Sequence, residues 1–466
     1  MKFANNLLLA VTIITLSAFY LSAQNNWIWA EKINGNNDIN LDGISIDNAD
    51  NLYWQIVFEG DITIGSKTFS SAGGSDGMII KYNSNGDTIW SAQYGGVNDE
   101  TPGELDIDAS ANIYISGFFS DDAVFDGTTL DGVTGNNIYI AKYSTNGSLS
   151  WAINAGNATD YLEITDILID ESDNILITGL FEGTLTIGTE IAISNNYQNP
   201  FIAKFDNTGN IVWLKYYKST NDNVLFRRIS CCKNEGLYII GHISDTLFVE
   251  DDTLVSTSAG TFDGILLKVL DNGNVDWIRQ FGDNSRIKGT TVCSDTSGNA
   301  IIAGIFETGI LIDSTDLVLF DSQSYTSAGE YDVFIAKYDK NGLLKWFIAN
   351  GGAELDNPNT ITCNNQYIQI SGIFENSPVW NEDTLIASDK DAFIIDTDTH
   401  PDDFVEPKVY PKCPVCGKRD YMIAYSSVRV GGVIDDNPDV VKMKQDLLDK
   451  GIYESNAGLY ISVGLV

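Results

Sequence analysis

The fold is decided by a short stretch that recurs along the chain, and at residues 137–151 it reads NIYIAKYSTNGSLSW. The alternating apolar residues before Lys142 predict a strand. Asn146-Gly147 predicts a tight turn, because glycine adopts a positive φ at no steric cost. A second strand then carries Trp151. We therefore expect a β-hairpin here.

The tryptophan of this hairpin recurs with a period of about 61 residues. The structural repeat is marked by Trp29, Trp90, Trp151, Trp213, Trp277 and Trp346. A second hairpin follows the tryptophan, and its clearest copies read DASANIYISG, DESDNILITG and DTSGNAIIAG, starting at Asp108, Asp170 and Asp295. Each repeat thus supplies four short strands and a variable insertion such as Glu182–Tyr197, and helical periodicity is absent.

Four antiparallel strands per repeat are typical of a β-propeller, in which neighbouring sheets bury one another's faces. A solenoid would need a shorter period, and a sandwich would need more strands. The first tryptophan strand has no Ile/Phe-rich strand before it, and the last Ile/Phe-rich strand, Asp391–Thr397, has no tryptophan strand after it. We therefore expect an all-β, six-bladed propeller of four-stranded repeats, in which the segment around Trp27–Ile33 joins the last blade and closes the ring.

The chain divides into a signal peptide over residues 1–23, a propeller over 24–400 and a small segment over 401–466. Met1-Lys2, an apolar stretch and Ser22-Ala23 form the pattern of a secretory signal. A membrane anchor is the alternative, but it usually needs ~20 apolar residues. We expect cleavage after Ala23 and a protein exported to the periplasm, the cell surface or the medium, with no transmembrane segment after cleavage.

The charge balance excludes some partners. The chain has 64 acidic and 27 basic residues, a net charge of −37, and two histidines. Nucleic acids and anionic membrane surfaces repel such a protein. Chemistry that needs several imidazoles is nearly excluded as well.

The C-terminal segment differs in composition from the repeats, with 8 basic and 10 acidic residues over 401–466. Asn437-Pro438 followed by apolar residues at helical spacing, and then by Gly451, predicts a short amphipathic helix. A strand is expected over Gly458–Val466. We expect a small α/β segment.

The repeat resembles the SBBP-type β-propeller repeats of secreted bacterial proteins, especially those of Bacteroidota. The resemblance lies in the D-x-F-I-A-K-Y, N-G-x-x-x-W and I-x-x-D-x-x-x-N-I-Y-I-x-G elements and covers about residues 27–397. It implies an exported or surface propeller with no assigned chemistry. Members of this family commonly have about seven blades, whereas six are counted here, and no type IX sorting domain is evident.

Cys413 and Cys416, in the sequence CPVCG, resemble half of a zinc ribbon. A structural zinc site needs four ligands, and the segment contains no second pair; His400 would be a third ligand only if the chain folded back. A disulfide or a C-x-x-C redox pair is an alternative. Our preferred interpretation is a remnant of a larger domain.

Four other cysteines lie within the repeats, as the adjacent Cys231 and Cys232 and as Cys293 and Cys363 at nearly matching places. A disulfide needs Cα atoms within about 7 Å, and equivalent points on neighbouring blades are usually farther apart. We therefore expect buried free thiols.

The turn aspartates Asp47, Asp108, Asp170 and Asp295 are candidate calcium ligands. The alternative is that each D-x-x-x-N turn hydrogen-bonds to its own backbone. Cys232 takes the aspartate position in the fourth repeat, which argues against one ion per blade. Apart from calcium here or zinc at the C-x-x-C pair, we expect no cofactor.

No convergent set of reactive residues is evident. His242 follows Gly241 where a sister repeat has Phe118, so a packed or rim position is expected; a Ser-His-Asp triad would have to use it. The recurring aromatic residues favour packing between blades over a carbohydrate platform.

These observations favour an exported, non-enzymatic propeller that binds a protein or glycan through its loops. Two alternatives remain open. The first is a polysaccharide hydrolase or lyase that uses acidic residues at the mouth of the ring. The second is a structural component of an envelope or adhesion assembly.

Overall fold

The computed structural model describes residues 29–398 and 459–463, with short gaps. The gaps are 36–38, 134, 233–235, 257–260, 283–285, 308, 312–323, 328, 364–366, 376–378, 381–382 and 385–389. The expected signal peptide, the expected helix of the C-terminal segment, His400, Cys413 and Cys416 therefore lie outside the described residues. No helix in the described part of the chain is long and apolar enough to cross a membrane.

The described chain is all-β and forms antiparallel four-stranded sheets one after another. Sheet 1 contains β2 (Ile39–Ile46), β3 (Leu52–Ile64), β4 (Lys67–Tyr82) and β5 (Thr88–Gly96). Sheet 2 contains β6 (Glu100–Ile107), β7 (Ile113–Phe119), β10 (Asn136–Tyr143) and β11 (Leu149–Ala158). Sheet 3 contains β12 (Tyr161–Ile169), β13 (Ile175–Glu182), β16 (Asn199–Phe205) and β17 (Ile211–Tyr216).

The second half of the chain continues this order. Sheet 4 contains β19 (Val224–Cys232), β20 (Gly236–Ile243), β23 (Asp263–Val269) and β24 (Val275–Phe281). Sheet 5 contains β25 (Ile287–Ser294), β26 (Ala300–Phe306), β29 (Asp332–Tyr338) and β30 (Leu344–Asn350). Sheet 6 has three strands in the described residues, β31 (Asp356–Cys363), β32 (Tyr367–Glu375) and β35 (Lys390–Asp398).

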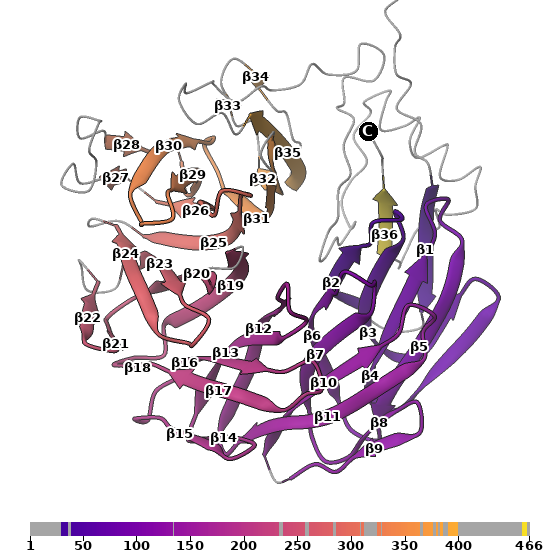
Figure 1. The fold of residues 1–466 in the computed structure, drawn as a ribbon. Coiled ribbons are helices and arrows are strands. Elements are labelled where there is room, and N and C mark those ends of the chain that lie inside the picture. The colour runs from indigo at the N-terminus through magenta and orange to yellow at the C-terminus, as the bar shows by residue number, and fades with distance from the viewer. Residues whose placement is uncertain are drawn as a thin grey trace, which may run out of the picture.

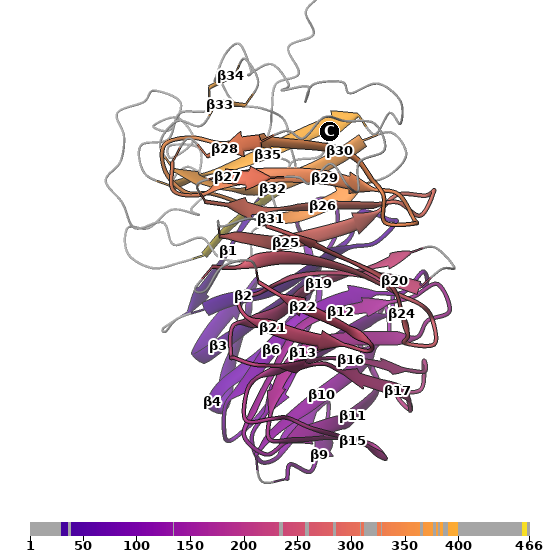
Figure 2. The same cartoon turned by 90° about the vertical axis from the view of Figure 1, so that its left-hand side faces the viewer.

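The sheets follow one another along an arc, with the first strand of each sheet on its inner side (Figure 1). These inner strands, β2, β6, β12, β19, β25 and β31, pack against one another in that order. Figure 2 shows the same succession from the side, from β12 up to β35. Apolar side chains from facing sheets form the buried clusters between them. This arrangement is consistent with a propeller.

The insertions are short hairpins that extend the preceding sheet. β8 (Ala123–Phe125) and β9 (Thr128–Leu130) belong to sheet 2 in the chain, but β8 pairs with β5 of sheet 1. In the same way, β14 (Thr184–Ile187) with β15 (Glu190–Ile193) extends sheet 2 through β11. The outer edge strand of one sheet is therefore covered by the next, which protects its backbone groups from other chains.

The remaining hairpins lie farther along the chain. β21 (Thr246–Val249) and β22 (Asp252–Val255) pair with β18 (Lys218–Ser219), which follows sheet 3. Two further two-stranded hairpins are β27 (Gly309–Leu311) with β28 (Ser324–Thr326), and β33 (Val379–Trp380) with β34 (Asp383–Thr384).

The prediction that the opening strand completes the last sheet is wrong. β1 (Trp29–Gly35) pairs with β36 (Leu459–Val463) and with the end of β3, whereas β35 pairs with β32 alone among the described strands. The opening strand pairs elsewhere because a strand near the other end of the chain competes for it. β36 forms five consecutive residue pairs with β1, from Trp29↔Val463 to Ile33↔Leu459. The strand expected at 458–466 thus exists as β36.

Tryptophans fasten sheets 1, 3 and 4 to the turn of the next sheet. The Trp90 indole Nε1–H donates to the backbone carbonyl of Thr145 at 3.1 Å, and Trp213 and Trp277 donate in the same way to Asp271 and Lys340 at 3.0 Å. Each acceptor lies in the turn before the glycine of the N-G motif or its equivalent. The repeated tryptophan therefore carries a contact between sheets.

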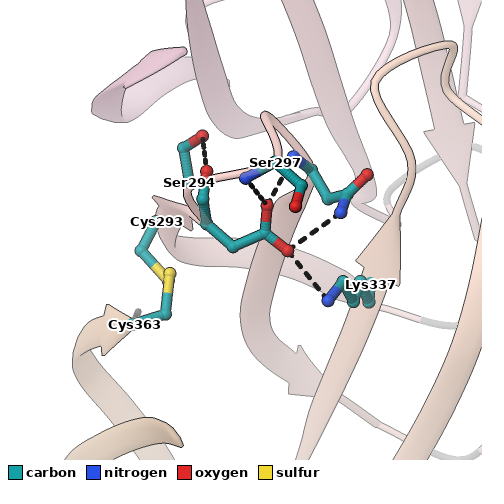
Figure 3. The surroundings of a disulfide bond; sticks show 7 residues. Cys293, Ser294, Ser297, Lys337 and Cys363 are labelled. Carbon is teal, nitrogen blue, oxygen red and sulfur yellow. Dashed lines mark hydrogen bonds and ion pairs between the residues drawn. A yellow bond between two sulfur atoms is a disulfide. The ribbon is translucent and has the colours of Figure 1, made fainter. Parts of the chain in front are cut away.

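The cysteine prediction is also wrong for one pair. Cys293 of β25 and Cys363 of β31 form a disulfide with a Cα–Cα distance of 6.0 Å, across a sequence separation of 70 (Figure 3). The inner strands of neighbouring sheets pack directly on each other, which brings the two cysteines within bonding distance. Cys231 and Cys232 are free thiols, as expected.

The contact between Trp90 and Gly147 predicts a position-specific loss of stability. Gly147 has φ 84°, and an added Cβ would lie 2.6 Å from the Trp90 ring. Gly147→Ala should lower the free energy of unfolding by about 2 kcal/mol more than Gly127→Ala. Gly127 is the matched control because it has φ 80° with open space around its Cβ. Equal losses in urea unfolding would contradict the contact.

The disulfide predicts that the peptides containing Cys293 and Cys363 are covalently linked and that sheet 6 is held to sheet 5. Peptide mapping without reductant should recover Cys293 and Cys363 in one species. Cys363→Ser should reduce stability by about 2–4 kcal/mol and expose sheet 6 to limited proteolysis. Cys231→Ser is the control, since that thiol is unpaired. Recovery of both cysteines as free thiols in native protein would overturn the pairing.

Candidate functional site

The turn that follows each inner strand is organised around one aspartate. In sheet 1, Asp47 Oδ1 accepts hydrogen bonds from the backbone N–H groups of Ala49 and Asn51 at 2.9 and 3.0 Å. The Tyr53 hydroxyl donates to Asp47 Oδ2 at 2.9 Å, and Lys81 Nζ lies 3.6 Å from the same oxygen. Burial opposes ionisation, but the hydrogen bonds, led by that from Asn51, hold the pKa of Asp47 at about 2.

The same ion pair recurs along the arc. A buried lysine from the third strand of the sheet reaches the turn aspartate of its own sheet, and in sheet 5 it points directly at that turn (Figure 3). The nitrogen–oxygen distances are 3.5 Å for Lys142–Asp108, 2.9 Å for Lys204–Asp170 and 2.9 Å for Lys337–Asp295. In sheet 4, Cys232 takes the aspartate position, and Lys268 approaches Asp276 at 3.6 Å. The turn aspartates therefore serve as fixed anions within the fold.

These turns are poorly suited to calcium. The Asp47 carboxylate already accepts from two backbone amides, Asn51 Nδ2 and Tyr53, and faces Lys81. A cation would have to displace these donors and would be repelled by the lysine. Within the described ranges, no group of three or more His, Cys, Asp or Glu side chains is placed to hold a metal ion.

An open cavity of about 400 Å³, with a mixed polar and apolar lining, lies where the turns of sheets 2–5 converge. This mouth cavity is lined by Ile107, Asp108, Ala109, Ile169, Asp170, Glu171, Asp173, Cys231, Ser294, Asp295 and Thr296. Asp108, Asp170 and Asp295 are held by their own turns and lysines. Glu171 is exposed and Asp173 is half-buried, and neither carboxylate forms a hydrogen bond or ion pair in the described residues. They are the acceptors that this cavity offers to a ligand.

Cys231 lies in the lining of the mouth cavity but is not a prepared nucleophile. Burial, and after it the charge of Asp170, raises the pKa of its thiol to about 11. Since the thiolate is the reactive form, this thiol is inert at neutral pH.

Buried acids connect the inner strands below the mouth cavity. Asp106 Oδ2 accepts from the Ile169 amide at 2.8 Å, and Asp166 Oδ2 accepts from the Ile229 amide at 2.7 Å. Each bond runs from one sheet to the next. Burial raises the pKa of Asp106 to about 6 and that of Asp166 to about 7. Sequence reasoning did not identify these residues, because they resemble ordinary strand positions.

An ion pair completes this network. Arg228 Nη2 lies 2.6 Å from Glu104 Oε1, and Arg228 Nη1 donates to the Thr165 carbonyl at 2.9 Å. The three residues come from sheets 4, 2 and 3. The network ties three inner strands together and leaves neither the arginine nor Glu104 free for chemistry.

Every inner strand is bulged at the same level. The pairing register with the second strand shifts at the same point in all six sheets, between Leu41 and Gly43 in sheet 1 and between Phe226 and Arg228 in sheet 4. A bulge redirects side chains and is common near functional sites. The residues skipped by the register include Asp42, Thr165, Arg227, Thr290 and Asn359.

His242 does not lie in the mouth cavity. It is 8% exposed, on β20, opposite Leu225 of β19. Burial and then the charges of Lys288 and Arg227 lower its pKa to about 3. No hydroxyl and carboxylate are placed beside it as a triad would require, since in the described residues its Nδ1 has no hydrogen-bond partner.

Comparisons with known proteins give a distant likeness. No family model matches the chain. The uncharacterised WD repeat-containing protein L264 of Acanthamoeba polyphaga mimivirus is 26% identical over 231 residues. The match covers 44% of this chain, and the chain spans only 16% of that protein's length.

Among solved structures, Kuenenia stuttgartiensis hydrazine synthase has a TM-score of 0.39 at 10% identity, covering 72% of this chain and 76% of that one. A polysaccharide lyase, the PL25 ulvan lyase, also has a TM-score of 0.39, at 9% identity, covering 77% and 87%. Virginiamycin B lyase from Staphylococcus aureus has a TM-score of 0.34 at 10% identity, covering 78% and 98%. Likeness at this level assigns no activity.

The two classes of carboxyl group predict a stability maximum in mildly acidic solution. Burial raises the pKa of Glu100 and Asp166 to about 7. The folded protein therefore binds more protons than the unfolded chain above roughly pH 4, so stability falls as the pH rises toward 7. The pKa of Asp47 is lowered to about 2, so its contribution is lost as the pH falls from about 4 toward 2.

Urea unfolding between pH 3 and pH 8 should give the largest free energy of unfolding near pH 4. Asp166→Asn keeps an acceptor for the Ile229 amide but removes the titration, so it should flatten the decline between about pH 4 and pH 7. An unaltered decline in this variant would contradict the assignment.

Proposed function

We propose that this chain is an exported, non-enzymatic scaffold of the propeller type that binds a protein or glycan ligand outside the cytoplasm. The observation that carries the proposal is the mouth cavity, which is built from the turns of four consecutive sheets and has unpaired carboxylates at Glu171 and Asp173. A volume of about 400 Å³ lies within the range of ligand pockets. The sequence resemblance to SBBP-type repeats of secreted proteins supports the same proposal.

The lining favours ligands that donate hydrogen bonds. Carboxylates accept and do not donate when ionised, and the chain carries a net charge of −37. Saccharide hydroxyls, or lysine and arginine side chains on a protein surface, are suitable donors. The disulfide between Cys293 and Cys363 supports export, since such bonds persist in oxidising compartments.

The alternative of a polysaccharide hydrolase or lyase has less support. A general acid at neutral pH needs a raised pKa. The turn aspartates of the mouth cavity, Asp108, Asp170 and Asp295, have lowered pKa values despite their burial, because hydrogen bonds stabilise the ionised form. Among the acids with raised pKa values, Asp106 and Asp166 accept hydrogen bonds from amides of neighbouring strands. Two others, Glu100 and Asp76, do not line the mouth cavity.

If the ligand binds in the mouth cavity, removing the carboxylates of Glu171 and Asp173 should lower its affinity. The probes are neutral polysaccharides on an array and lysine-rich peptides on a sensor surface. Glu171→Gln with Asp173→Asn should weaken binding of the preferred probe about tenfold, through the loss of two charge-assisted hydrogen bonds. Glu190→Gln, on the exposed β15, is the matched control and should bind as the unaltered protein does.

The same proteins should show no turnover of chromogenic glycosides or of polysaccharides. Turnover that disappears in Glu171→Gln or Asp173→Asn would contradict the non-enzymatic proposal. If the control and the double variant bind the probe equally, the ligand does not bind in the mouth cavity.

A further inference from the structure

Two cationic side chains on the inner strands of sheets 4 and 5 form no ion pair within the described residues. Arg227 belongs to β19 and Lys288 to β25, and these inner strands pack against each other. In the described residues, neither side chain donates a hydrogen bond or forms an ion pair. The neighbouring arginines do form ion pairs: Arg228 lies 2.6 Å from Glu104, and Arg286 lies 3.7 Å from Glu307.

A buried histidine with an unused nitrogen lies beside them. His242 is 8% exposed, and none of the described residues offers its Nδ1 a hydrogen-bond partner. Its ring meets the Phe262 ring edge to face, with centroids 5.1 Å apart. Lys288 Nζ lies 4.0 Å from the centroid of the same phenylalanine ring. The same phenylalanine ring therefore contacts both the imidazole and the ammonium group.

The electrostatics of this group are unbalanced toward positive charge. Burial, followed by the charges of Arg227 and Arg286, lowers the pKa of Lys288. Burial and the adjacent Arg228 lower the pKa of Arg227, although Glu104 acts in the opposite sense. Half-buried like charges destabilise a fold unless an anion compensates them. In a chain with a net charge of −37, such a group is unexpected.

The backbone places Arg227 in a special position. It is the residue skipped by the register shift between Phe226 and Arg228. The equivalent bulges hold Asp42 in sheet 1, Thr165 in sheet 3 and Thr290 in sheet 5. Sheet 4 thus carries a cation at a point where these sister sheets carry acidic or neutral polar side chains.

We propose that Arg227, Lys288 and His242, which we call the cation cluster, bind an oxyanion such as a carboxylate or sulfate group. Arg227 and Lys288 supply charge-assisted hydrogen bonds to its oxygens. The neutral imidazole presents Nδ1–H as a third donor. A metal cation does not suit this group, because its neighbours would repel it. The cluster lies toward the start of β25, whereas the mouth cavity lies at the end of that strand, so the two sites are independent.

The test uses the two histidines of the chain, His242 and His400, as reporters. The protein is labelled with carbon-13 at histidine, and His400→Ala assigns the two signals. Sodium sulfate and sodium acetate are titrated separately at constant ionic strength, with sodium chloride as the reference salt. We expect a saturable shift of the His242 signal with sulfate or acetate, and no shift of the His400 signal.

Variants separate binding from general charge effects. Lys288→Met keeps an apolar stem against Phe262 and should weaken the oxyanion at least about tenfold, whereas Lys288→Arg should restore most of the affinity. Lys218→Met removes one positive charge from the exposed β18 and is the matched control. Thermal unfolding checks that each variant folds.

Three results would overturn the proposal. They are a His242 signal that does not respond, a response that chloride reproduces, and equal affinities in Lys288→Met and Lys218→Met. A response to sulfate alone would assign the site to a sulfated ligand, and a response to acetate alone would assign it to a carboxylated ligand. Either response supports an oxyanion site.

Discussion

Three of the boundaries between sheets share one contact, in which a tryptophan of one sheet binds the turn of the next. The indole N–H needs an acceptor, and the turn supplies a backbone carbonyl at 3.0–3.1 Å. The turn lies close enough only because glycine has no side chain: a Cβ at Gly273 would lie 3.0 Å from the Trp213 ring. The turn's positive φ, its glycine and the tryptophan 60 or so residues earlier therefore form one unit.

Buried charges set the second constraint. A lysine of the third strand reaches the aspartate of the inner turn, and nearly all of these groups are buried. Removing one partner would leave the other charge uncompensated, so the pair acts as a requirement for the correct register rather than as a large source of stability. Despite their burial, hydrogen bonds of the turn and this pairing lower the pKa of Asp108, Asp170 and Asp295, which does not suit a catalytic acid; this is why we propose binding rather than catalysis at the mouth cavity.

The sequence was sufficient to predict features that rest on local chemistry. The hairpins, the D-x-x-x-N turns and the four strands per repeat follow from alternation and from turn residues such as Asn146-Gly147. Features that join distant segments were not predictable, because they depend on geometry at the inner strands. The Cys293–Cys363 disulfide and the pairing of β1 with β36 are of this kind. The mouth cavity was predictable in part, because the repeated turn motif identifies Asp108, Asp170 and Asp295 of its lining. The cation cluster was not, because its three residues follow no repeated motif.

The most direct test of the central contact is a double-mutant cycle in sheets 4 and 5. An added Cβ at Gly342 would lie 2.9 Å from the Trp277 ring, across the boundary between these sheets. Trp277→Leu, Gly342→Ala and the double variant are compared by urea unfolding. If the contact fastens the sheets, the double variant loses at least about 1 kcal/mol less than the sum of the single losses, because removal of the ring relieves the clash. Additivity within about 0.5 kcal/mol would contradict the account.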